Sequence, residues 1–174
     1  LSGLASLANV VGAQSLRPLD GPQLGSSTGC YDQARGRTIL MGDAYDVWEW
    51  DGTRWLPRPF EGPHWSWRTL VHDSARRRTY ALGAGQPTAA MLSWVSDGTR
   101  WLAQNPATAP ASRVDALFVY DAARHEIVMF GGFESATLMP SHATWGFDGA
   151  QWHEYQPANR PPARSRSAGA FGSS

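Results

Sequence analysis

The sequence contains no lysine and a single cysteine, and its charges cancel. All 15 basic residues are arginines, and they balance 15 acidic residues at a formal net charge of zero. Without a basic excess, the electrostatic attraction that holds proteins on nucleic acids or anionic membrane surfaces is missing. The lone Cys30 excludes an internal disulfide framework and a multi-cysteine zinc cluster. No apolar run approaches the ~20 residues of a membrane-spanning helix, which excludes a transmembrane protein.

Tryptophan, glycine and proline are abundant instead. The chain of 174 residues has 9 Trp, 18 Gly and 12 Pro, while only 17% of its residues are charged. Such a composition is typical of many short strands joined by turns. The length suits a single domain with a sizeable core.

The first 13 residues are small, apolar and uncharged, and they end in Val11-Gly12-Ala13. Small residues at the first and third positions before a cleavage point suit signal peptidase. We therefore expect residues 1–13 to be the remnant of a secretory signal peptide, and the protein to be exported, either secreted or periplasmic. A buried first strand or short helix is the alternative.

Two sequence signatures recur three times in constant order. The first runs from Tyr or His followed by Asp to a glycine, and occurs at 31–42, 72–83 and 120–132. The second has Asp-Gly three residues before a Trp, and occurs at 48–55, 94–101 and 145–152. A fourth copy begins at 161–171, which resembles 111–120. A period of about 40–50 residues indicates a tandem array.

Each copy predicts four antiparallel strands. The Asp-x-Ala-Arg step is a tight turn, in which Asp accepts backbone hydrogen bonds and pairs with Arg. In the third copy the strand before this turn is expected at Val114–Tyr120 and the strand after it at Ile127–Phe130. Asp-Gly predicts a type I′ hairpin, which needs positive φ at both central residues. Four strands per copy with no helix between them favour a propeller.

The Tyr-Asp-x-x-Arg turn, the strand closing on Gly-Gly, and the Trp with Asp-Gly-x-x-Trp together resemble bacterial kelch repeats. The resemblance covers residues 28–171 and implies an all-β fold, an incomplete β-propeller of four-stranded antiparallel kelch-type blades. Only the third copy keeps the whole pattern. We expect a signal remnant at 1–13, a lead-in at 14–27, blades at 28–56, 57–102 and 103–154, and a linker with the start of a truncated fourth blade at 155–174.

Residues that occur once in every blade are expected to be structural, because a functional site would be used once. The aspartate–arginine turns, the Asp-Gly hairpins, the tryptophans and the glycine doublet meet this criterion. They are Asp32, Arg35, Trp48, Asp51, Gly52, Trp55, Asp73, Arg76, Trp94, Asp97, Gly98, Trp101, Asp121, Arg124, Gly131, Gly132, Trp145, Asp148, Gly149 and Trp152. We expect Trp55, Trp101 and Trp152 to be largely buried and equivalently placed.

No catalytic constellation is recognised, and we expect no cofactor and no metal. The histidines lack the i, i+4 pairing and the accompanying carboxylates of a metal site. They are His64, His72, His125, His142 and His153. Galactose oxidase, a relative in propeller type, uses copper with a cysteine-linked tyrosine. Adjacent Cys30 and Tyr31 point to opposite faces of a strand and cannot cross-link in that way. Asp97 and Gly98 are adjacent, unlike the separated pair of a sialidase Asp-box.

Strand parity places the variable segments together. The tight turns emerge at one end of the blades, while the second loops and the interblade links emerge at the other, where recognition is expected. The candidate binding residues there are Phe60, His64, Trp65, Trp67, Arg68, Phe133, Glu134 and His142. Aromatic faces with polar neighbours suit a peptide or a sugar ring. Alternatively, Trp65 or Trp67 begins the next inner strand and is buried.

The sequence therefore predicts a protein- or glycan-binding or scaffolding module of an exported bacterial protein, with the remaining blades in the same chain. The competing hypothesis is the propeller of a galactose-oxidase-like or other carbohydrate-acting enzyme, whose catalytic residues lie outside this segment. A purely structural surface protein is the third. Propeller architecture alone does not decide among them.

Overall fold

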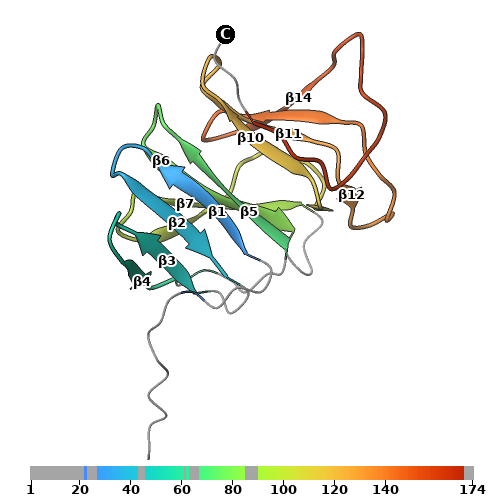
Figure 1. Ribbon diagram of the computed structural model, residues 1–174. Coiled ribbons are helices and arrows are strands. Elements are labelled where there is room, and N and C mark those ends of the chain that lie inside the picture. The colour runs from blue at the N-terminus through green and yellow to red at the C-terminus, as the bar shows by residue number, and fades with distance from the viewer. Residues whose placement is uncertain are drawn as a thin grey trace, which may run out of the picture.

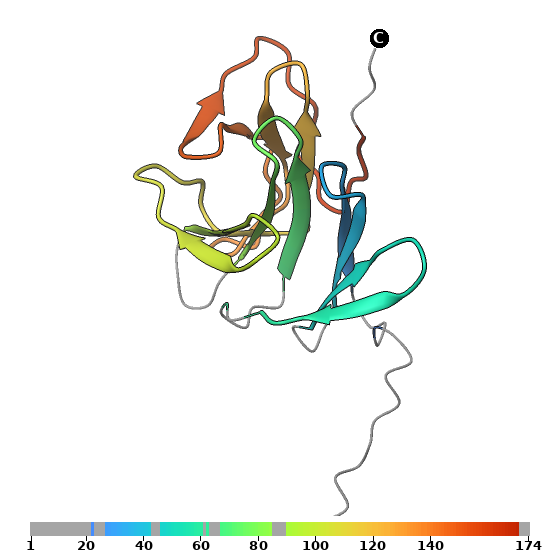
Figure 2. The same ribbon diagram turned by 90° about the vertical axis from the view of Figure 1, so that its left-hand side faces the viewer.

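The computed structural model describes residues 22, 27–42, 46–60, 62, 67–84 and 90–170, with only the backbone at Trp67. These residues form an all-β structure in which no helix is found. Three four-stranded antiparallel sheets lie side by side in chain order (Figures 1 and 2) and form an incomplete propeller. The predicted fold class is thus confirmed. The expected signal remnant, residues 1–13, lies outside the described residues.

Each sheet is one blade. Blade 1 consists of β1 (Thr28–Asp32), β2 (Arg37–Met41), β3 (Val47–Trp50) and β4 (Trp55–Arg58). Blade 2 consists of β5 (Trp67–Asp73), β6 (Arg78–Ala84), β7 (Met91–Ser96) and β8 (Trp101–Gln104). Blade 3 consists of β10 (Leu117–Asp121), β11 (Glu126–Phe130), β13 (Thr144–Phe147) and β14 (Trp152–Tyr155). A separate small ribbon pairs β9 (Arg113–Val114) with β12 (Phe133–Glu134).

The Asp-x-Ala-Arg turns form as the sequence predicts. Asp73 accepts hydrogen bonds from the backbone nitrogen of Arg76 at 2.9 Å and from its Nη1 at 2.7 Å. The residue after each arginine has positive φ, at 64° for Gly36, 56° for Arg77 and 58° for His125. Only glycine adopts this conformation without steric penalty. The carboxylate–arginine contacts therefore hold a turn that is sterically disfavoured in two of the three copies, at Arg77 and at His125.

The Asp-Gly hairpins differ from the predicted type I′ turn. Only the glycine has positive φ, for example 98° at Gly52. The loop between β3 and β4 spans Asp51 to Arg54, and Asp51 Oδ1 accepts the backbone N–H groups of Thr53 at 2.8 Å and Arg54 at 2.9 Å. Because the aspartate side chain satisfies these donors, the longer loop closes without a second residue at positive φ.

One predicted strand is divided. The segment Val114–Tyr120 splits into β9 and β10 at Asp115, whose φ is 56°. Arg166 holds this break, since its backbone nitrogen donates to Asp115 O at 2.9 Å and its Nε lies 3.0 Å from Asp115 Oδ2. Val114 then pairs with Phe133 on β12 rather than continuing the inner strand of blade 3.

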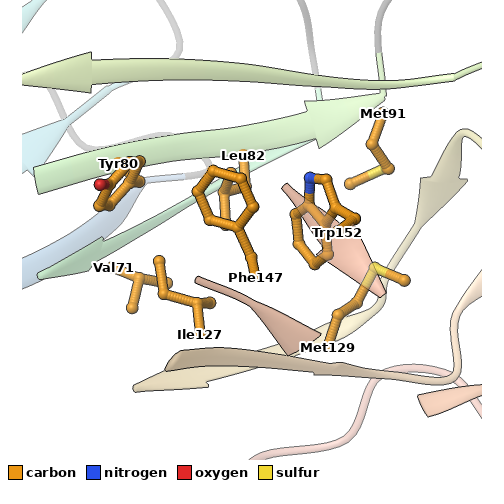
Figure 3. Packing of buried hydrophobic residues seen from close by; sticks show 8 residues of the cluster. All are labelled: Val71, Tyr80, Leu82, Met91, Ile127, Met129, Phe147 and Trp152. Carbon is orange, nitrogen blue, oxygen red and sulfur yellow. The ribbon is translucent and has the colours of Figure 1, made fainter. Parts of the chain in front are cut away.

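The apolar core lies between the blades. Between blades 2 and 3, Tyr80 and Leu82 meet Phe147 and Trp152 (Figure 3), and the rings of Tyr80 and Phe147 pack edge to face. Between blades 1 and 2, a second cluster includes Ile39 and Leu70. Side chains alternate between the faces of a strand, so each blade uses one face for the preceding blade and the other for the following one.

The repeated tryptophans are equivalently placed but unequally buried. Trp55, Trp101 and Trp152 each begin the outermost strand of their blade, on the face toward the preceding blade. Trp152 is only 2% exposed, whereas Trp101 and Trp55 are half-buried. None of the three is exposed, but the degree of burial differs from blade to blade. Trp55 lies on the face of blade 1 that points away from blade 2. The burial of the tryptophan at this position depends on what covers that face.

Candidate functional site

The two ends of the blades are chemically different. At the tight-turn end, the Arg35 guanidinium of blade 1 lies against Gly98 of blade 2, and Arg76 of blade 2 lies against Gly149 of blade 3. At the long-loop end, Ser135 N donates to Ser112 O at 2.8 Å. This agrees with the parity argument from the sequence, which places the turns at one end and the loops and links at the other.

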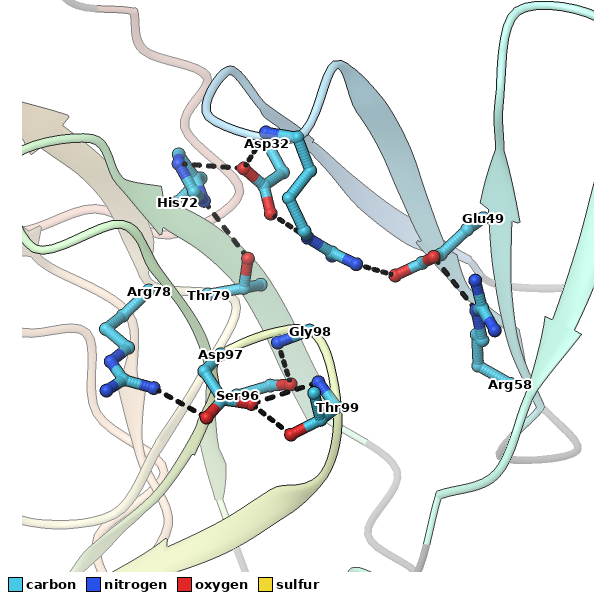
Figure 4. A network of polar contacts seen from close by, with 11 residues as sticks. Asp32, Glu49, Arg58, His72, Arg78, Thr79, Ser96, Asp97, Gly98 and Thr99 are labelled. Atoms are coloured by element: carbon cyan, nitrogen blue, oxygen red, sulfur yellow. Dashed lines mark hydrogen bonds and ion pairs between the residues drawn. The ribbon is translucent and has the colours of Figure 1, made fainter.

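A polar network fills the tight-turn end of the junction between blades 1 and 2 (Figure 4). Arg35 Nε lies 2.6 Å from Asp32 Oδ2, and Arg35 Nη1 lies 2.7 Å from Glu49 Oε1. Arg58 Nε reaches the other oxygen of Glu49 at 2.9 Å. Burial opposes ionisation of Asp32, but hydrogen bonds from Arg35 outweigh it and lower the pKa of that carboxyl. Both carboxylates are engaged by arginines, which leaves neither as a general base.

Cys30 and His72 approach the same network without forming a nucleophile. Burial raises the pKa of the Cys30 thiol to about 12, so the thiol stays protonated at neutral pH. Cys30 packs toward blade 2, while Tyr31 on the opposite face is 58% exposed. The adjacent pair is therefore not placed for a cross-link, as the sequence predicts.

His72 is buried beside Asp32 and is uncharged at neutral pH. Its Nδ1 lies 3.1 Å from Thr79 Oγ1 and its Nε2 lies 3.4 Å from Asp32 Oδ1. Burial lowers the pKa of His72 below its usual value, although Asp32 acts in the other direction. Because the imidazole is neutral, the contact with Asp32 is not a full ion pair.

A pH-dependent loss of stability is expected from His72. Its pKa is lower in the folded chain than in the unfolded chain, where it is about 6.5. Below that pH the unfolded state binds more protons, and the free energy of unfolding falls. Between about pH 7 and pH 5, we expect the free energy of unfolding to fall less in His72→Gln than in the unchanged chain. Urea unfolding at each pH measures this difference. The exposed His142→Gln is the control, and an unchanged pH slope in His72→Gln would contradict the assignment.

At the long-loop end of blade 3, residues 133–141 form a hairpin whose base is held by Arg113. Arg113 is 5% exposed, and its Nη1 donates to Ser141 Oγ at 2.8 Å and to Gly131 O at 3.3 Å. Arg113 Nη2 lies 3.5 Å from Glu134 Oε1 at the start of the hairpin. These contacts join both sides of the hairpin to the blade.

The tip of this hairpin presents two large apolar side chains to solvent. Leu138 is 73% exposed and Met139 is 64% exposed. Leu138 has a φ of 55°, and its backbone nitrogen donates to Glu134 O at 2.8 Å. A leucine with positive φ is sterically disfavoured. Sequence reasoning missed both residues, although two adjacent large apolar residues before Pro140 in a variable loop were a usable signal.

The structure places the predicted binding residues in different environments. Phe60 is half-buried and packs on Trp101 with 5.5 Å between ring centroids, and Arg68 donates to the carbonyl of Gly42, so both serve the junction of blades 1 and 2. Phe133 and Glu134 are half-buried at the hairpin base. His142 is exposed, with its Nε2 3.3 Å from Arg160 Nη1. His64, Trp65 and the Trp67 side chain lie outside the described residues.

Comparison with known proteins identifies no family for this chain. No protein-family model matches this chain, and no curated protein shows significant similarity to it. Within the described ranges, no cluster of three or more His, Cys, Asp or Glu side chains is arranged to hold a metal ion. The same part of the chain contains no helix long and apolar enough to cross a membrane.

Proposed function

We propose that this chain is part of a kelch-type propeller of an exported bacterial protein, and that it binds a protein partner through its long-loop end. The observation that carries the proposal is the exposed Leu138–Met139 tip on a hairpin whose base is fixed by Arg113. Exposed apolar side chains on a rigid support lose water on binding at little entropic cost.

The chemistry of the tip favours a protein over a glycan. Methionine and leucine fit apolar pockets, and methionine adapts to irregular ones. A sugar ring would instead stack on an aromatic face. Among the predicted aromatic binding residues of the link between blades 1 and 2, the structure describes the side chain of Phe60 alone. Its ring already packs on Trp94 and Trp101.

The kelch assignment and the export are supported by different features. The Asp–Arg turns and the Asp-Gly-x-x-Trp hairpins occupy equivalent positions in three blades. Export is supported by the small apolar character of residues 1–13.

The test is binding of the chain, immobilised, to a panel of exported bacterial proteins and to a glycan array. For a protein that binds, Leu138→Ser combined with Met139→Ser is expected to weaken the affinity by about 10–100-fold, because two apolar side chains lose their burial. The control is Leu102→Ser, an exposed leucine on β8 that is 47% accessible. Binding of glycans alone, unaffected by the tip substitutions, would contradict the proposal.

A further inference from the structure

Two strand positions that repeat from blade to blade are occupied differently in the two junctions. Directly after an Arg-Thr pair, blade 1 has Ile39 where blade 2 has Tyr80, and directly before the Asp-Gly pair, blade 2 has Ser96 where blade 3 has Phe147. Between blades 2 and 3, the ring centroids of Tyr80 and Phe147 are 5.4 Å apart, and those of Phe147 and Trp152 are 4.8 Å apart (Figure 3). Aromatic rings therefore fill that junction.

Between blades 1 and 2 the corresponding space is a cavity. It has a volume of about 340 Å³, lies beside the polar network of Figure 4, and is lined by both Ile39 and Ser96. Trp101, the counterpart of Trp152, forms part of its wall and stays half-buried. Blade 1 supplies one side of the cavity and blade 2 the other. The space exists because isoleucine and serine are smaller than the tyrosine and phenylalanine of the other junction.

The walls of this cavity carry charges at positions that are uncharged in the other junction. Glu49 stands where blade 2 has Val95, and Arg58 stands where blade 2 has Gln104. Glu49 is 3% exposed, and its two oxygens accept from Arg35 and Arg58 separately. A carboxylate oxygen has a second lone pair and a guanidinium has several N–H donors, so both groups can bond a ligand as well. Residues that a repeated array uses once indicate function rather than packing.

The charges at the cavity balance one another. Arg35 and Arg58 face Asp32 and Glu49, and His72 beside Asp32 is neutral at neutral pH because burial lowers its pKa. A ligand with a net charge would lose its hydration without meeting an uncompensated opposite charge. The cavity therefore suits an uncharged ligand that both donates and accepts hydrogen bonds, as hydroxyl groups do.

We propose that this cavity binds a neutral monosaccharide, either free or at the end of a glycan. The sugar hydroxyl groups donate to Glu49 and accept from Arg58, while the C–H face of the ring lies against the apolar wall that contains Val47 and Trp101. The Arg58 side chain is 43% exposed and Thr99 is exposed, so the mouth opens to solvent. The volume lies near the lower end of the range for small-molecule sites, about 300–1,000 Å³, which suits a single sugar unit.

Calorimetric titration with glucose, galactose and mannose tests the proposal, with the uronic acid and the amino sugar of each as charged comparators. We expect at least one neutral sugar to bind, and its charged counterparts to bind about tenfold more weakly or less. The same sugars at the ends of immobilised glycans show which of the two forms is preferred. Binding of no neutral sugar in either form, or tighter binding of a charged counterpart, would overturn the proposal.

Two substitutions borrow residues from the other junction. Ser96→Phe places a ring in the cavity, as Phe147 does between blades 2 and 3, and Arg58→Gln removes a charged donor, as Gln104 does in blade 2. Each is expected to weaken sugar binding about tenfold or more. The control is Arg54→Gln, at an arginine of the same blade whose side chain is 74% exposed. Near-UV circular dichroism verifies the fold of each variant, and sugar binding unchanged in both would contradict the assignment.

This inference does not rest on the proposed protein binding, because the cavity and the hairpin tip lie at opposite ends of the blades. The combined substitution Leu138→Ser and Met139→Ser should leave sugar binding unchanged. Loss of sugar binding in that variant would place the sugar at the long-loop end and overturn the assignment to the cavity. A chain that binds a protein through the tip but no sugar would support the proposed function and contradict this inference.

Discussion

Replacing Trp152 with alanine is expected to lower the free energy of unfolding by about 3–5 kcal/mol, the range for a large buried aromatic. The indole is 2% exposed and packs on Phe147, with 4.8 Å between ring centroids. It belongs to the cluster that joins blades 2 and 3, together with Leu82 and Met129. The substitution leaves a cavity between two sheets, which relaxation of the surrounding side chains fills only in part.

The matched control is Trp55→Ala, at the equivalent position of blade 1. Because Trp55 is half-buried, its loss should cost about 1–2 kcal/mol. Urea unfolding followed by circular dichroism measures both values. Equal losses at the two positions would contradict the view that the neighbouring blade, rather than the strand itself, determines the contribution of this tryptophan.

Asp73→Ala is expected to lower the free energy of unfolding by about 2–4 kcal/mol, because a buried carboxylate with charged hydrogen-bond donors is removed. Asp73 is 1% exposed and holds both the backbone and the side chain of Arg76. Arg76 Nη1 also donates to His125 O of blade 3 at 2.7 Å. The substitution therefore weakens a turn and a junction together.

Asp121→Ala provides the comparison for this second prediction. It removes the same kind of pair, with Arg124 Nη1 2.6 Å from Asp121 Oδ2, but the Arg124 side chain is 66% exposed. Solvent screens such a pair, so its loss should cost about 1 kcal/mol. Urea unfolding is again the measurement, and a larger loss at Asp121 than at Asp73 would show that the junction with the next blade does not strengthen the turn.

The sequence was sufficient for the architecture because the signals for the blades are local. An aspartate three residues before an arginine forms its turn from atoms within that segment, as Asp32 and Arg35 do. The Asp-Gly hairpins are similarly self-contained, although the loop conformation depended on Asp51 accepting N–H groups, which the dipeptide pattern did not reveal. Repetition of these two signals in constant order predicts four-stranded units.

The candidate site was harder to predict because burial is decided by distant residues. Phe60 belongs to a variable link and looked like an exposed anchor, but its ring packs on Trp94 and Trp101 of the next blade and is half-buried. Leu138 and Met139 are apolar, and composition alone would place them inside. Their exposure follows from a hairpin held at its base by Arg113, a contact between segments 28 residues apart.

The contact between Arg35 and Gly98 has a consequence for how such a chain can change over time. A side chain at position 98 or 149 would displace the arginine of the preceding blade and would itself be strained by the positive φ, so a substitution at the tight-turn end disturbs a junction as well as a turn. The hairpin tip at Leu138 and Met139 has no such counterpart among the described residues, and it can be replaced one residue at a time. Divergence in specificity is therefore least constrained at the long-loop end, while the tight-turn end keeps successive blades in register.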